Sequence, residues 1–219
     1  MTYYQDYTYK RLNYAPVKFS LQSRIRAISE AALNRFPQGI ETMLDLGSAD
    51  GLLAEGVVKT VRHIQTVYAL DLDFDLLRGN PFRAIQGDCC RMPFAENRFD
   101  LITAAALIEH LPDPNLFLKE CKRVLRPGGA LALTCPAPFF DWLATHIGYL
   151  KNVGHLARYG LVDLRKLCRQ AGMKIVWQKK FMITPIHIKG HQSIENICRK
   201  LGLSCLMLNQ VIVATKPIT

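Results

Sequence analysis

The sequence contains no long apolar run. Its most apolar long stretch, residues 139–150, is interrupted by Asp141 and His146, and it is shorter than the roughly 20 residues that a membrane-spanning helix needs. The tyrosine-rich N-terminus lacks the apolar core of a signal peptide. These absences argue against a transmembrane or secreted protein, and we expect a cytoplasmic one.

Paired cysteine motifs are also lacking. The seven cysteines include no C-x-x-C pair, and no histidine belongs to a compact Cys/His cluster. This pattern excludes a disulfide scaffold and a structural zinc site of the usual spacing. We therefore expect reduced thiols and no bound metal.

Acidic residues are scarce in the last third of the chain. Residues 1–150 hold 16 Lys/Arg and 16 Asp/Glu, whereas residues 151–219 hold 12 and 2, which accounts for the whole net charge of +10. Such a surface suits nucleic acid, anionic lipid head groups or an acidic substrate, although a solvated basic face explains it equally well. With 49% hydrophobic and 21% charged residues, the 219-residue chain fits one globular domain.

The most informative stretch is residues 43–51. The apolar run Met43-Leu44-Asp45-Leu46 leads into the turn Gly47-Ser48-Ala49-Asp50-Gly51, and a helix-compatible run, 52–59, follows. The pattern predicts a buried parallel strand, a tight turn and a helix whose first N–H groups can bind a polar or anionic ligand. A glycine turn of this kind also ends strands that bind nothing.

Carboxylates follow the next two apolar runs. Residues 66–70 lead into Asp71, 20 positions after Gly51, which is about the spacing at which Rossmann-like units hold ribose hydroxyls. The third run ends at Gly87-Asp88. We expect Asp45, Asp71 and Asp88 to converge on one ligand from the tips of neighbouring parallel strands.

Six segments, in this order, resemble the class I S-adenosylmethionine-dependent methyltransferases, specifically the type 11 group. These segments are residues 44–51, 69–73, 87–94, 99–102, 108–111 and 125–129. The resemblance implies S-adenosyl-L-methionine as the cofactor, and a Rossmann-like, doubly wound seven-stranded α/β sheet that is mostly parallel with an antiparallel last strand.

The resemblance also implies a set of cofactor-binding residues. Asp45 and Gly47 would line the methionine end, Asp71 would hold the ribose, and Asp88 with the Cys89 N–H would face the adenine. The full implied set is Asp45, Gly47, Ser48, Ala49, Gly51, Asp71, Leu72, Asp88, Cys89 and Ala105. Ala49 departs from the family's G-x-G-x-G turn, and its methyl group should fit if the residue avoids positive φ.

The alternation of strands and helices organises the rest of the chain. We expect an N-terminal aromatic lid and helix over residues 1–36, and a single methyltransferase domain over 37–219 with a basic C-terminal third and a helical excursion at 184–208. Within these parts the pattern predicts a helix over 20–36, a helix terminator at 127–129, and a long connection over 139–159.

Catalytic residues are harder to identify, because methyl transfer depends chiefly on alignment and needs a base only when the acceptor must lose a proton. The candidates are Glu109 and His110, which follow the fourth strand, and His155, the preferred general base. The segment around His155 resembles the His-containing segment before a helix in several type 11 enzymes. A histidine that only orients a loop is the alternative. His146, Tyr149 and Tyr159 lie in the same connection.

The residues that nucleobase methyltransferases use are missing. Ala104-Ala105-Ala106 stands in place of an Asn/Asp-Pro-Pro-aromatic box, and Cys135 precedes rather than follows its proline. We therefore expect a small organic or lipid-like acceptor, with an anionic group facing the basic third, and not nucleic acid; peripheral membrane contact is compatible with the charge. Two other functions stay open: a catalytically silent methyltransferase-like binding protein and a nicotinamide dehydrogenase.

Overall fold

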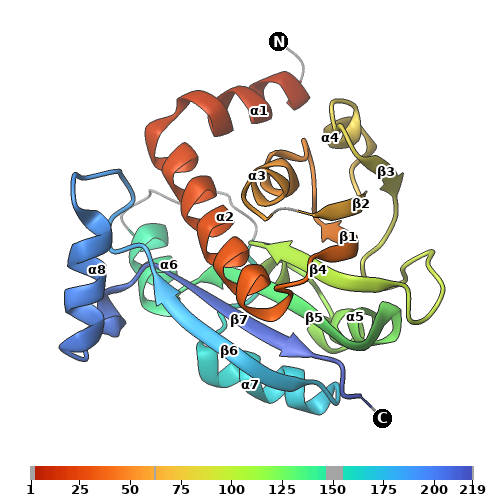
Figure 1. The fold of residues 1–219 in the computed structure, drawn as a ribbon. Helices are drawn as coiled ribbons and strands as arrows, with labels where there is room; N and C mark the ends of the chain where they lie inside the picture. Colours follow the sequence, from red (N-terminus) through yellow and green to blue (C-terminus); the bar gives the residue numbers. More distant parts are fainter. Residues whose placement is uncertain (1–2, 62, 147–154, 219) are drawn as a thin grey trace.

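A seven-stranded sheet in the order β3-β2-β1-β4-β5-β7-β6 forms the centre of the computed structural model (Figure 1), which describes residues 3–61, 63–146 and 155–218. Strands β3, β2, β1, β4 and β5 pair in parallel, and β7 runs antiparallel to both β5 and β6. The predicted mostly parallel α/β sheet with an antiparallel last strand is confirmed. The strands are β1 (Ile40–Leu46), β2 (Ile64–Asp71), β3 (Arg83–Gln86), β4 (Phe99–Ala105), β5 (Leu125–Pro136), β6 (Lys174–Phe181) and β7 (Asn209–Thr215).

Helices cover both faces of the sheet (Figure 1): α2 and α3 lie on one face, and α5 and α7 on the other. No helix of the described residues is long and apolar enough to cross a membrane. The helices are α1 (Tyr3–Asn13), α2 (Ala15–Arg35), α3 (Leu52–Thr60), α4 (Phe74–Leu77), α5 (Pro114–Val124), α6 (Pro138–His146), α7 (Leu161–Gln170) and α8 (His191–Lys200), with the 3-10 turns η1 (Ile108–His110) and η2 (Ser204–Leu206).

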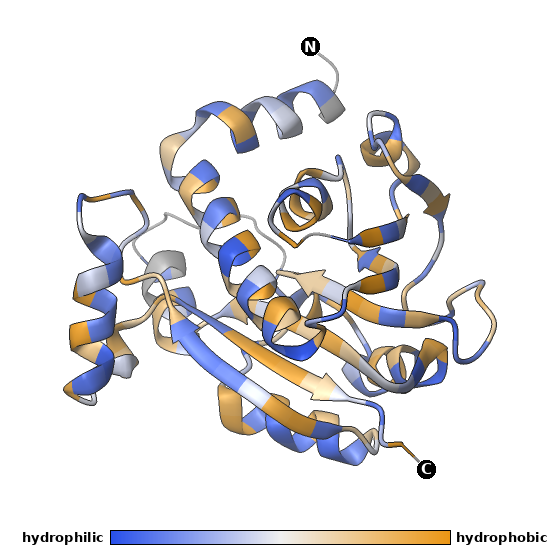
Figure 2. Cartoon of the chain, in the orientation of Figure 1, coloured by the Kyte–Doolittle hydropathy of each residue, from blue (hydrophilic) through white to orange (hydrophobic). Residues whose placement is uncertain are grey.

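The apolar runs form strands because the sheet buries both of their faces. Successive side chains of β1 point to opposite sides, so Met43 packs with Ile28 of α2 whereas Leu44 packs in the cluster that holds Phe117 of α5. In Figure 2 the apolar colour follows the central strands, whereas much of the edge strand β6 has the hydrophilic colour. Asp45 is therefore a buried carboxyl group between the buried apolar residues Leu44 and Leu46.

Three local predictions differ from the structure. The first helix after the N-terminal segment begins at Ala15, not Ser20, because Pro16 occupies its first turn. Residues 127–129 do not end a helix: α5 stops at Val124, and β5 already starts at Leu125, which pairs with Phe99. The connection predicted over 139–159 contains helix α6, since Pro138 also sits at a helix start.

Candidate active site

The turn after β1 is held by three hydrogen bonds that involve Asp71 and Asn80. The Ala49 N–H donates to Asp71 Oδ2 (2.9 Å), and the Asn80 amide donates to Ser48 Oγ (3.0 Å) and to the Ala49 carbonyl (2.9 Å). Ala49 adopts φ +46°, so the expectation that this residue avoids positive φ is wrong. The left-handed conformation of a residue with a methyl side chain costs roughly 1 kcal/mol. The three hydrogen bonds of the turn offset this cost.

Asp45 is almost completely buried at the end of β1. Its Oδ1 accepts a hydrogen bond from Thr103 Oγ1 of β4 (2.6 Å), while Oδ2 accepts none from any described residue. Burial disfavours the charged form and raises the pKa of this carboxyl to about 6. A buried acceptor without a donor is costly, and a cationic ligand would satisfy it.

A cavity of about 320 Å³ opens where β1, β4 and β5 end and β7 begins, which is where open α/β sheets bind ligands. Gly47 and Ala105 line its sheet side, and Tyr7 and Arg11 of α1 lie across from them. Most of its remaining wall is apolar. The wall also includes Val17, Arg24, Glu109, His110, Pro136, Phe140, His155, Met182, Pro185 and Asn209.

The three predicted catalytic residues meet in this cavity. The rings of His110 and His155 pack edge to face with their centres 4.8 Å apart, and the backbone N–H of Leu156 donates to the Glu109 carbonyl (2.8 Å), which ties the two segments together. Burial raises the pKa of Glu109, and neither of its carboxyl oxygens has a hydrogen-bond partner among the described residues.

Asp141 holds His155 in place. Its buried carboxylate accepts a hydrogen bond from His155 Nδ1 through Oδ1 (2.6 Å) and one from Arg158 Nε through Oδ2 (2.6 Å). A proton on Nδ1 leaves Nε2 as the acceptor nitrogen of the neutral ring. The arrangement is that of a histidine base oriented by a carboxylate.

Two arginines that the sequence argument missed also reach the cavity. Arg24 Nε is buried without a partner among the described residues, and burial lowers the pKa of its guanidinium, with Glu109 the nearest opposing charge. Arg11 of α1 forms an ion pair with Asp50 in the turn (2.6 Å), and Thr8 donates to the same carboxylate. Arg24 follows Leu21 on the face of α2 that contains Ile28, and an arginine among buried helix positions is a signal that a sequence search could use.

The remaining predicted cofactor residues are divided between two places. Asp71 and Leu72 line a shallow opening of about 540 Å³ that also includes Phe74 and Gln86. Asp88 follows the neighbouring strand β3, but its Oδ1 accepts from the Cys90 N–H (2.7 Å), and neither Asp88 nor Cys89 lines the central cavity or this opening.

The other positions lie close to the turn or outside the cavity. Ser48 is buried, and Gly51 caps α3 with φ +77°. His146 is exposed, with Nδ1 bonded to the Trp142 carbonyl (2.9 Å), and Tyr149 lies outside the described residues. The structure therefore separates His146 from the cluster that contains His155.

Glu109, His110 and His155 also offer one ligand atom each within 4.8 Å of one another, and these atom types bind divalent metals. The sequence gives no local metal-ligand spacing here, because His155 lies 45 positions beyond His110. Only the fold brings the three together.

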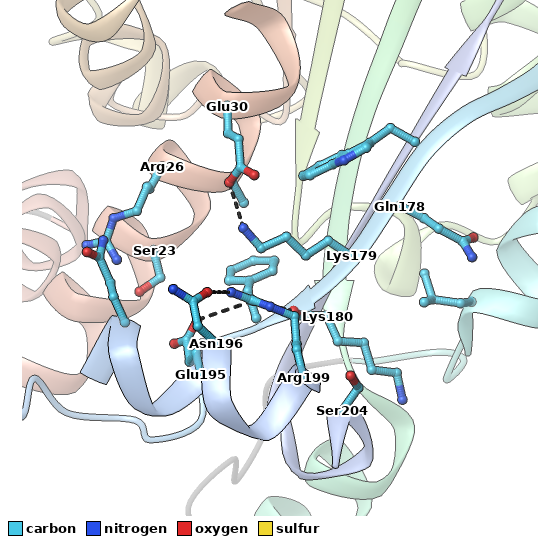
Figure 3. A pocket seen from close by; sticks show the side chains of 15 residues that line it. Ser23, Arg26, Glu30, Gln178, Lys179, Lys180, Glu195, Asn196, Arg199 and Ser204 are labelled. Atoms are coloured by element: carbon cyan, nitrogen blue, oxygen red, sulfur yellow. Dashed lines mark hydrogen bonds and ion pairs between the residues drawn. The ribbon is translucent and has the colours of Figure 1, made fainter. Parts of the chain in front are cut away.

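A larger cavity of about 660 Å³ lies between α2, β6 and α8 (Figure 3). Much of its charge is already paired, since Lys179 bonds Glu30 (2.6 Å) and Arg199 lies 3.8 Å from Glu195. It contains none of the predicted cofactor or catalytic residues, so the smaller cavity is the candidate active site.

A seven-stranded sheet with β7 antiparallel between β5 and β6, and a ligand cleft at the ends of β1 and β4, is the class I methyltransferase architecture. Residues 44–133 match the family model described as "Methyltransferase domain", of type 11. The protein is an S-adenosylmethionine-dependent methyltransferase.

Similar proteins agree with this assignment. The chain is 26% identical over 178 residues to an Escherichia coli protein named ubiquinone biosynthesis O-methyltransferase, a match that covers 76% of this chain and 71% of that protein. A solved S-adenosylmethionine-dependent methyltransferase from Thermotoga maritima superposes with a TM-score of 0.71 at 16% identity, covering 98% of this chain and 96% of that one. The cyclase SpnF also superposes, with a TM-score of 0.62 at 17% identity over 88% of this chain and 81% of its own. At such identities the structural likeness shows the fold alone.

The site residues fit the cofactor. Its methionine part carries an ammonium and a carboxylate. Among the buried groups without partners here, the Asp45 carboxyl oxygen and the Arg24 N–H have the complementary charges, and Glu109 is a second unpartnered carboxyl group. Its adenosine part has vicinal hydroxyls, for which the Asp71 carboxylate at the end of β2 is suited.

Proposed function

We propose that the protein methylates a hydroxyl group of a small organic or lipid-like acceptor, with His155 as the general base. The observation that carries the proposal is the 2.6 Å contact between His155 Nδ1 and Asp141 Oδ1, made beside a cavity that Gly47 and Ala105 also line. A histidine oriented in this way beside the cavity suits removal of a proton from an acceptor hydroxyl.

The walls of the cavity support the choice of acceptor. Val17, Phe140, Met182 and Pro185 supply apolar surface, and a volume of about 320 Å³ suits a small molecule better than a macromolecule. The named activity of the Escherichia coli relative is O-methylation, which agrees with a base placed to deprotonate a hydroxyl. The acceptor that these features support is a small organic or lipid-like molecule.

The chain's residues have distinct roles in this proposal. S-adenosylmethionine supplies, when bound, an electrophilic methyl group on a sulfonium. Arg24 binds the carboxylate and Asp45 the ammonium of the methionine part, and Asp71 holds the ribose, so that the reacting atoms are aligned. His155 Nε2 would accept the proton of the acceptor hydroxyl, and Asp141 would stabilise the resulting imidazolium.

The test compares His155→Gln with Asp141→Asn and with the control His146→Gln, whose ring is exposed and outside the cavity. Labelled methyl groups from the cofactor are followed into a metabolite extract and then into the acceptor identified there. We expect His155→Gln to lower kcat by about 10²- to 10⁴-fold while the Kd of S-adenosylhomocysteine, measured by calorimetry, stays unchanged.

Asp141→Asn should also lower kcat, but by less, because the imidazole loses the carboxylate that orients it. His146→Gln should behave as wild type. Full turnover by His155→Gln would remove the histidine from the chemistry. Cofactor binding without methyl transfer to any compound of the extract would instead favour the catalytically silent binding protein.

A further inference from the structure

The segment between β6 and β7 carries an apolar surface that nothing in the described structure covers. Ile194, Ile197 and Leu201 are spaced i, i+3 and i+7 along α8 and therefore share one side of the helix, whereas His191 and Glu195 on another side are buried. We call the exposed apolar residues of this segment the α8 surface; each is at least 39% exposed, and they are Ile186, Ile194, Ile197, Leu201, Leu203 and Leu206.

The charges around the α8 surface are almost all positive. Lys180, Lys189 and Lys200 form no ion pair with any residue that the structure describes. The only acidic residue between Met182 and Leu208 is Glu195, which is buried and accepts a hydrogen bond from the Met182 N–H (3.0 Å). No exposed carboxylate of this segment therefore offsets its lysines.

The 660 Å³ cavity continues the basic character on the other side of α8. In Figure 3 the Arg199 guanidinium points toward Glu195 and Asn196, whereas the Lys180 side chain extends away from it, past Ser204. Lys180 therefore remains as a cation for a phosphate, while Lys179 and Arg199 are already paired with Glu30 and Glu195.

Charge decides which partner fits. A symmetric contact between two copies would place lysines against lysines, and the basic last third of each copy would repel the other. An anionic bilayer offers both complementary features, because apolar side chains insert at the level of the acyl chains while Lys and Arg remain among the phosphates.

We propose that the α8 surface docks the protein onto membranes that contain anionic lipid. The proposal goes beyond methyl transfer and does not depend on it. Its location is favourable for an apolar acceptor, since Pro185 lines the central cavity and the next residue, Ile186, belongs to the α8 surface. The mouth of the cavity therefore lies next to the docking surface.

The experiment is co-sedimentation of the full chain with vesicles of phosphatidylcholine alone or mixed with phosphatidylglycerol. We expect binding to the mixed vesicles, no binding to pure phosphatidylcholine, and weakening as NaCl is raised, because salt screens the attraction. Glycerol phosphate should compete poorly, since it cannot accept the apolar side chains; effective competition by it would show a site for a soluble phosphate and overturn the membrane proposal.

Two variants separate the contributions. Lys189→Gln/Lys200→Gln should weaken binding to the mixed vesicles by about 30-fold, since each lysine near an anionic surface contributes about 1 kcal/mol. Ile197→Ser/Leu201→Ser should also weaken it, at unchanged net charge.

Matched controls lie on α7. Lys166→Gln/Arg169→Gln removes two exposed cations from the same basic third, and Val162→Ser removes an exposed apolar residue. These controls should bind as wild type, and circular dichroism with S-adenosylhomocysteine binding checks that every variant is folded. Wild-type protein that ignores mixed vesicles, α8 variants that bind as wild type, or α7 controls that lose as much would each overturn the proposal.

Discussion

Two buried carboxyl groups, those of Asp45 and Glu109, carry oxygens that no described residue hydrogen-bonds. Burial raises the pKa of both. Burying a carboxylate without a partner lowers the free energy of unfolding, whereas a well-packed apolar residue at the same position would not lower it. Such a cost is typical of a ligand-binding site, where the ligand supplies the missing partner, and Asp45 is the position where it can be measured.

Replacing Asp45 with Asn tests this cost through pH. The folded-state pKa of about 6 lies above the ordinary value of about 4. The stability contributed by Asp45 is therefore fully present below about pH 4 and is lost as the pH rises through about 6. Asn never ionises, so we expect Asp45→Asn to be more stable than wild type at pH 8 by on the order of 2 kcal/mol, with the difference vanishing toward pH 4.

Urea unfolding at several pH values measures the difference, and Glu55→Gln, at an exposed position, should show no comparable trend. The affinity for the cofactor should change with pH in the opposite direction to the stability. The Kd of wild type rises below pH 6 as the carboxylate is protonated, and Asp45→Asn binds weakly at every pH. A stability difference that did not change with pH would mean that Asp45 titrates as an ordinary carboxyl.

At the same scale, the sequence predicts some site residues and misses others for physical reasons. Gly47 and Asp71 follow recognisable strand ends, and a strand end in a parallel sheet fixes where a residue lies. Asp141 comes 14 positions before His155 with a helix and a connection between them, so no local spacing links the two. Ala49 shows that a turn can hold a non-glycine residue at positive φ when neighbouring side chains fix its backbone.

Among the elements, α1 has the clearest functional consequence. Its Tyr7 and Arg11 line the candidate cavity, and Arg11 pairs with the buried Asp50 of the turn. Both side chains of this pair are largely out of water, at 13% and 1% exposure, so breaking it leaves an uncompensated buried carboxylate. We infer that α1 acts as a lid whose closure depends on this pair.

Arg11→Gln should loosen α1 without unfolding the sheet. We expect the Kd of S-adenosylhomocysteine to rise about tenfold, equivalent to roughly 1.4 kcal/mol, and the amide hydrogens of α1 to exchange faster while those of β4 stay protected. The matched control is Lys10→Gln, one residue earlier, whose partner Asp6 is exposed and whose ion pair contributes little. Unchanged exchange in α1 together with unchanged affinity would exclude the lid role.

The sequence predicts regular elements well where periodicity is clear and poorly where it is not. The sequence predicts a helix over 161–170 and a strand over 174–181, and α7 and β6 have these bounds, because their apolar positions recur in a helix or strand period. Helix α6 was missed because Pro136 and Pro138 indicated only that no central strand continues there, although proline is compatible with the first turn of a helix. Helix α1 was not predicted as a helix, since its tyrosines show no apolar face.

At the scale of the whole molecule, the free cysteines report how the core unfolds. Five of the seven are buried, Cys198 is partly exposed and Cys205 is exposed. The buried five lie in the same apolar cluster although they come from the loop after β3, from α5, β5 and α7. Burial raises the pKa of Cys135 and Cys168 to about 12, so these thiols are unreactive in the folded protein.

Pulse labelling with a thiol reagent across a urea titration should therefore give three classes of reaction. Cys205 reacts at once without denaturant and Cys198 more slowly, whereas Cys89, Cys90, Cys121, Cys135 and Cys168 become reactive together, at the midpoint seen by circular dichroism. Cys205→Ser is the control that removes the fast class and leaves the midpoint of the others unchanged. If Cys89 and Cys90 reacted at a lower urea concentration than Cys168, the two ends of the sheet would unfold separately. The shared cluster would then not act as one cooperative core. Simultaneous exposure of all five would instead mean that the site at the strand ends is lost only when the entire sheet unfolds.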